Sequence, residues 1–133
     1  MEYNELLDWY KDERKIDKLK ESFKVYIKNS ESEEIAKINI DNVCNFLNDN
    51  YENICNIVTD KMLNEKNENW LDDDEEPLTR DYFIKILNKI DSISINNDLT
   101  TNIYFDDNNL FWGTLIEVNL NKDLHITNVG LVK

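Results

Sequence analysis

The chain has 133 residues, of which 41% are hydrophobic and 11% aromatic. This is enough apolar material for a folded domain, and it excludes a disordered acidic tail. Asp and Glu number 28 against 15 Lys and Arg, which gives a net charge of −13 at pH 7. Because such a surface repels phosphate, the composition argues against nucleic acids and anionic membranes as partners. It favours a basic protein partner, or it serves solubility alone.

The N-terminal segment is predicted to be a peripheral helix over residues 1–21. Its apolar residues recur mostly at helical spacing, at Leu6, Trp9, Tyr10, Ile16 and Leu19. The segment has neither a basic region nor an apolar run, so we expect no signal peptide and a cytoplasmic protein. The following residues, Phe23–Lys28, alternate apolar and polar side chains, which predicts a half-buried strand.

Two amphipathic helices are predicted next. Ser30 with Glu33 is typical of a capping box at the start of the first helix, which ends near Asn48–Asn50. The second helix runs from Tyr51 to about Lys66, and so short a joint predicts an antiparallel pair. The two cysteines lie on the apolar stripes of these helices: Cys44 and Cys55 are interpreted as buried, reduced thiols, with a disulfide as the alternative.

An acidic segment interrupts the helical pattern. Five consecutive acids, Asp72–Glu76, precede Pro77, which disfavours a helical residue before it. We expect an exposed loop here, held in place by Trp70 and Leu71. Thr79 is then predicted to cap a further helix, which buries Tyr82, Phe83, Ile86, Leu87 and Ile90.

From residue 91 the apolar period changes from about 3.6 to 2, which predicts strands. Short turns at residues 96–98, 106–109 and 121–123 separate four of them, as in an antiparallel meander. The strand Leu110–Leu120 is apolar on both faces, so we place it centrally. The predicted fold is a single α+β domain over residues 1–133, a mainly antiparallel β-meander sheet with helices packed on one face.

Catalytic chemistry has little support in the residues. His125 is the only histidine, and no nucleophile elbow, phosphate-binding glycine loop or zinc-ligand spacing accompanies it. The acids are abundant oxygen ligands, yet they lack the EF-hand spacing. Asp106 and Asp107 form a turn expected to be too exposed for a general acid. We therefore predict no catalytic residues, metal or cofactor. The alternative is a metal- or carboxylate-dependent enzyme using the Asp106/Asp107 turn.

The tryptophans beside the acids can be interpreted in two ways. Trp70 precedes the acidic run, and Trp112 follows the Asp-rich turn. Both rings can belong to the core, which for Trp112 is the preferred interpretation. Otherwise they form an aromatic anchor ringed by carboxylates that holds a basic partner. The candidate interaction residues are then Trp70, Asp72, Asp73, Asp74, Glu75, Glu76, Asp106 and Asp107.

The stretches Asn69–Thr79 and Tyr104–Gly113 resemble an uncharacterised bacterial family, domain of unknown function 2262. The resemblance extends over about Phe23 to Leu131, a family-like core at residues 23–132. The family's histidine after Trp-Gly is Thr114 here, and its turn glycine is replaced by Asn108-Asn109. The motif residues are Trp70, Leu71, Pro77, Phe105, Asp106, Asp107, Phe111, Trp112 and Gly113.

Loss of that histidine favours a structural or binding role for the motif. Small acidic members of the family look like the immunity proteins encoded beside bacterial toxins, an analogy of size and charge. We therefore predict a non-enzymatic, cytoplasmic protein-binding domain, similar to an immunity protein, that neutralises a basic partner.

Overall fold

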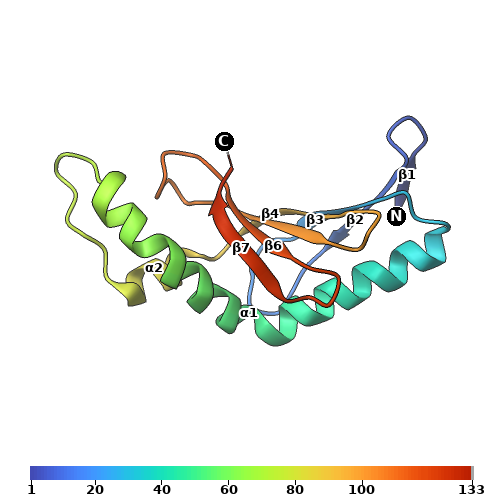
Figure 1. The fold of residues 1–133 in the computed structure, drawn as a ribbon, viewed down its shortest axis with the longest axis horizontal. Coiled ribbons are helices and arrows are strands. Elements are labelled where there is room, and N and C mark those ends of the chain that lie inside the picture. The colour runs from blue at the N-terminus through green and yellow to red at the C-terminus, as the bar shows by residue number, and fades with distance from the viewer. Residues whose placement is uncertain (133) are drawn as a thin grey trace.

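A seven-stranded sheet in sequential order, β1 to β7, organises the fold in the computed structural model, which describes residues 1–132 (Figure 1). Neighbouring strands are antiparallel except for β3 and β4, which are parallel. This confirms the α+β class and the mainly antiparallel sheet. The elements are β1 Glu2–Asn4, β2 Trp9–Arg14, β3 Phe23–Lys28, α1 Glu33–Asn69, α2 Arg80–Ile86, β4 Ile90–Ile95, β5 Thr101–Phe105, β6 Ile116–Leu120 and β7 Ile126–Leu131.

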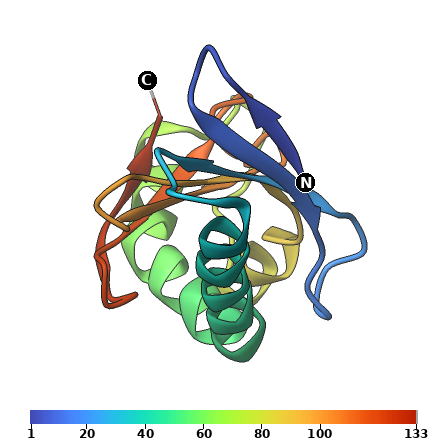
Figure 2. The same ribbon diagram turned by 90° about the vertical axis from the view of Figure 1, so that its right-hand side faces the viewer.

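The helices lie on one face of the sheet, as predicted (Figure 2). The core is the layer between them. A row of paired residues crosses four strands on this inner face and is fully buried: Val25, Ile93, Ile103 and Val118. Helix α1 supplies the opposing side chains. Since parallel strands require a long crossover, α1 and α2 together form the connection from β3 to β4.

The prediction of two antiparallel helices is wrong, because residues Glu33–Asn69 form one helix, α1. Its apolar stripe continues through residues 48–50, so burial against the sheet outweighs the weak helix propensity of the Asn-Asp-Asn sequence. The side-chain amide of Asn50 donates to the Phe46 carbonyl, and Figure 1 shows α1 bending in its middle. The N-cap is Ser32, whose hydroxyl accepts from the Ile35 amide, and not Ser30.

The predicted N-terminal helix over residues 1–21 is also wrong. Strands β1 and β2 form a hairpin, and β2 pairs along its whole length with β3. The aromatic residues that suggested a helical stripe instead pair across strands. The Tyr3 and Tyr10 rings lie 4.8 Å apart, and so do those of Trp9 and Tyr26. Such pairs stabilise a pleated surface.

The C-terminal half follows the prediction with two corrections. Helix α2 ends at Ile86, so Ile90 is buried in β4 and not on the helix, and Tyr82, which was expected to be buried, is 52% exposed. Strands β4 to β7 form the expected meander, and Thr79 caps α2 by accepting from the Tyr82 amide. The predicted strand Leu110–Leu120 begins only at Ile116, however, because Leu110–Leu115 belongs to the β5–β6 loop. Within residues 1–132, no helix combines the length and the apolar character needed to cross a membrane.

The cysteines are free and buried, as predicted. They lie eleven positions apart in one helix, about 16 Å along its axis, which rules out a disulfide between them. Burial raises the pKa of each thiol to about 11.

We therefore expect both thiols to resist alkylation in the native protein. At pH 8 only about one thiol in a thousand is ionised when its pKa is near 11. Iodoacetamide followed by intact-mass measurement should show no addition to the folded chain and two additions after denaturation. Rapid labelling of the folded chain would contradict the burial of Cys44 and Cys55.

Candidate functional site

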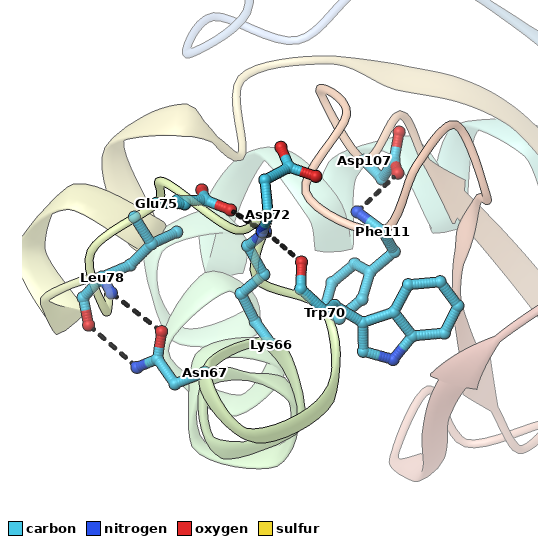
Figure 3. A network of polar contacts seen from close by, with 8 residues as sticks. All are labelled: Lys66, Asn67, Trp70, Asp72, Glu75, Leu78, Asp107 and Phe111. Atoms are coloured by element: carbon cyan, nitrogen blue, oxygen red, sulfur yellow. Dashed lines mark hydrogen bonds and ion pairs between the residues drawn. The ribbon is translucent and has the colours of Figure 1, made fainter.

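The candidate residues lie on two loops that contact each other. One loop, residues 70–79, follows α1, and the other, residues 106–115, connects β5 to β6. Their aromatic side chains meet: the ring centroid of Trp70 lies 5.6 Å from that of Phe111 and 4.8 Å from that of Trp112 (Figure 3 shows the first pair). We call the two loops, residues 70–79 and 106–115, the two-loop site.

A buried ion pair shapes the acidic loop. The Lys66 side chain is only 2% exposed, and its Nζ donates to Glu75 Oε1 at 2.9 Å and to the Trp70 carbonyl at 2.7 Å (Figure 3). Glu75 Oε1 also accepts from the Asp72 amide. These contacts hold the pKa of the Glu75 carboxyl below its usual range, with the Lys66 hydrogen bond as the largest cause. Glu75 is thus part of the loop's internal structure.

The far end of the same loop is fixed by Asn67. Its side-chain amide donates to the Leu78 carbonyl at 3.0 Å, and its carbonyl oxygen accepts from the Leu78 amide at 2.8 Å (Figure 3). Together with the Lys66 contacts, this pair closes the segment between α1 and α2 against the last turn of α1. The exposed loop is therefore ordered in spite of its charge.

Asp107 organises the second loop. It is 3% exposed, which corrects the expectation of an exposed turn. One carboxylate oxygen accepts from the Asn109 amide at 3.0 Å, and the other accepts from the amides of Phe111 at 2.9 Å and Gly113 at 3.0 Å. Three backbone donors therefore converge on one carboxylate. Both oxygens of Asp107 are therefore engaged by the backbone of its own loop.

The loop that Asp107 holds is tightly turned. Asn108, Asn109, Trp112 and Gly113 have φ values of 51°, 63°, 59° and 91°. Asn tolerates this left-handed region better than most residues, and Gly adopts it freely. Asn108 and Asn109 therefore fit this turn without a glycine. Trp112 is an unusual residue for such a backbone.

The preferred interpretation of Trp112 as a core residue is wrong: its side chain is 61% exposed. The left-handed backbone turns it away from the strand direction that the alternating pattern suggested. Trp70 is half-buried, and its indole N–H donates to Glu65 Oε1 at 3.0 Å. One face of the Trp70–Trp112 pair therefore rests on Phe111, while Trp112 extends into solvent.

The remaining candidate acids differ in their surroundings. Asp72, Asp73, Asp74 and Glu76 are exposed, and no ion pair among residues 1–132 involves them. Asp106 accepts from the Asn108 amide at 2.8 Å and lies 3.9 Å from Lys89 Nζ. Across the described chain, no group of three or more His, Cys, Asp or Glu side chains is placed to hold a metal ion.

His125 lies away from the two-loop site. It is exposed in the turn between β6 and β7, where its amide donates to Asn121 Oδ1. The 106–115 loop enters β6 at the opposite end, Ile116. The structure therefore does not bring His125 and the Asp106/Asp107 turn together.

Three functional neighbours, Glu65, Lys66 and Asn67, were not predicted. Only Lys66 has a signal in the sequence, because it continues the four-residue spacing of the buried Val58 and Met62. A lysine on an apolar stripe is rarely fully buried unless it is paired. Its partner, Glu75, lies nine residues away in the acidic run, and no spacing rule picks it out from its neighbours.

Comparisons with known proteins give one result. No curated protein and no solved structure matches the chain. A family model described as "Uncharacterized protein conserved in bacteria (DUF2262)" matches residues 1–131. The match starts at residue 1 and not at Phe23, so the N-terminal hairpin is part of the family's pattern. The chain belongs to this bacterial family, as its two motif segments suggested.

Proposed function

We propose that the two-loop site binds a basic protein and that the chain acts by binding and not by catalysis. The observation that carries the proposal is the exposed Trp112 ring, which lies 4.8 Å from the ring of Trp70 at the start of the loop whose residues 72–74 are exposed acids. Interfaces are typically anchored by an aromatic side chain in a desolvated centre. Surrounding carboxylates would attract a cationic surface and speed its approach.

The rigidity of the site supports this proposal. Asp107 fixes the loop that carries Trp112, and Lys66 with Asn67 fixes the acidic loop. A partner would therefore meet a surface that is already ordered, so little conformational entropy is lost on binding. The net charge of −13 adds a long-range attraction for a basic protein and a repulsion for nucleic acids and anionic membranes.

In the cell, the role we propose is that of an immunity-type protein, which neutralises a basic partner. A cytoplasmic location fits the two free, buried thiols, since thiols persist in reducing compartments. The geometry weighs against the alternative of an enzyme using the Asp106/Asp107 turn, because both oxygens of Asp107 already accept backbone hydrogen bonds.

Affinity capture tests the proposal. The full chain, immobilised at low salt, should retain a basic protein from the native host and release it at about 0.5 M salt, where the Debye length is only a few ångströms. Substituting Trp112 with alanine should weaken binding of the purified partner by about 30-fold, the loss typical of an interface hot spot.

A charge-matched pair of variants isolates the acidic loop. D72N/D73N/D74N and E2Q/E5Q/E13Q each change the net charge from −13 to −10, and all six side chains are exposed. We expect the first variant to slow association with the partner by about tenfold and the second to have a much smaller effect. Equal effects would reduce the role of the loop to general charge, and unchanged binding by Trp112→Ala would refute the site.

A further inference from the structure

Strand β7 forms one edge of the sheet and pairs only with β6 within residues 1–132. Figure 2 shows it in red on the side of the sheet opposite the blue N-terminal hairpin. Its six residues, Ile-Thr-Asn-Val-Gly-Leu, contain no charge in a chain of which 32% is charged. Edge strands are normally protected by charge, proline, shortness or a β-bulge. The register of β7 against β6 shifts at Thr127, so Asn128–Leu131 form the regular part of this edge.

The opposite edge is protected in this way. Strand β1 has only three residues, Glu2–Asn4, and one of them is an acid. Of the two sheet edges within residues 1–132, β7 therefore offers the longer uncharged row of backbone donors and acceptors, which is regular over Asn128–Leu131.

A groove with a mixed apolar and polar lining runs along β7. Ile126 and Val129 are half-buried there, and Val129 pairs with the fully buried Val118. Thr127 and Asn128 of β7 and Ile57 and Lys61 of α1 complete the lining of this groove, which has a volume of about 250 Å³. The edge thus combines free backbone groups with partly exposed apolar side chains, which are the two features that strand addition uses.

We propose that β7 pairs antiparallel with β7 of a second copy of this chain, so that two seven-stranded sheets become continuous across a twofold axis. Antiparallel pairing of identical edges is self-complementary, because each strand offers the other the same alternation of donors and acceptors. The uncharged strand brings no like charges into contact. Because the β1 edge is short and acidic, the assembly closes as a dimer instead of growing into a filament.

Salt separates this dimer from the complex proposed above. Each copy carries −13, so screening should strengthen the pairing of two copies. The same screening should weaken binding of a basic partner. The two interactions therefore fail independently and respond to salt in opposite directions.

Sedimentation velocity of the full chain tests the proposal. The wild type should shift from monomer to dimer as its concentration rises, at lower concentration in about 0.5 M than in about 0.05 M salt. T127K/N128K places two charges on exposed positions of β7 and should remain monomeric. N45K/N97K adds the same charge at exposed positions of α1 and the β4–β5 turn, and it should dimerise like the wild type.

Amide hydrogen exchange of the wild type gives a second readout that needs no variant. The amides of β7 that point away from β6 should become protected as the concentration rises, while the exchange of β1 stays unchanged. A wild type that remains monomeric in both salts, or a T127K/N128K variant that dimerises as the wild type does, would overturn the proposal.

Discussion

Replacing Asp107 with alanine is expected to lower the free energy of unfolding by about 2–4 kcal/mol, because hydrogen bonds to a charged group are strong and buried donors without partners are costly. The substitution leaves the amides of Asn109, Phe111 and Gly113 without their acceptor, and the site is closed to water. Urea unfolding followed by far-UV circular dichroism measures the change.

The neighbouring aspartate is the matched control. Asp106 accepts one backbone hydrogen bond, from Asn108, and lies near Lys89 at the surface. Asp106→Ala removes the same charge and should have a much smaller effect. Asp107→Asn should fall between the two, since its oxygen can still accept from Asn109 while its amide group faces two donors. Equal losses for Asp106→Ala and Asp107→Ala would contradict the organising role of Asp107.

The same substitution tests how Trp112 is presented. Its left-handed backbone persists only because the surrounding hydrogen bonds determine the turn. Once those bonds are lost, Trp112 should relax and separate from Trp70, whose ring now lies 4.8 Å away. We expect the near-ultraviolet circular dichroism of the tryptophan pair to decrease in Asp107→Ala, even at temperatures where the sheet remains folded.

The strands from β3 onward could be predicted because their alternation matches a sheet with one buried face. The row Val25, Ile93, Ile103 and Val118 is an example: each residue alternates with polar neighbours, and all four are fully buried. Local chemistry likewise predicted the Thr79 cap, since a capping hydroxyl acts within three residues.

The N-terminal hairpin could not be predicted in this way. Trp9 and Tyr10 have helical spacing with Ile16 and Leu19, but the rings of Trp9 and Tyr26 pair across strands. Only pairing with β3, a contact between distant residues, makes β2 a strand. The continuity of α1 through Asp49 and Asn50 has the same origin, because the sheet beneath outweighs local propensity.

At the two-loop site, the residue types were predictable but their roles were not. The tryptophans and acids are prominent in the sequence, and the structure does bring Trp70 and Trp112 together. Which acids are internal depends on geometry: Asp107 and Glu75 bind within the protein, whereas Asp73 and Asp74 are exposed. Composition does not distinguish these four carboxylates.

Glu75→Ala should lower the free energy of unfolding by about 3 kcal/mol, the cost of leaving a buried charge without its partner. Lys66, 2% exposed at its side chain, would keep only the Trp70 carbonyl as an acceptor. Asp74→Ala, one residue away and exposed, serves as the control and should change stability little. Urea titrations at pH 7 compare the three proteins.

The effect of Glu75 should also depend on pH. Its pKa is lowered in the folded protein, so the ionised carboxylate stabilises the fold at any pH above the ordinary glutamate value of about 4.3. That stability is lost as the pH falls through the lower folded value. Glu75→Gln cannot ionise, so its deficit relative to the wild type should be full at pH 7 and should shrink steadily below about pH 4.3. If the difference in free energy of unfolding between the wild type and Glu75→Gln stays constant down to the acid transition, the charge of Glu75 does not stabilise the pair with Lys66. Packing alone would then order the acidic loop.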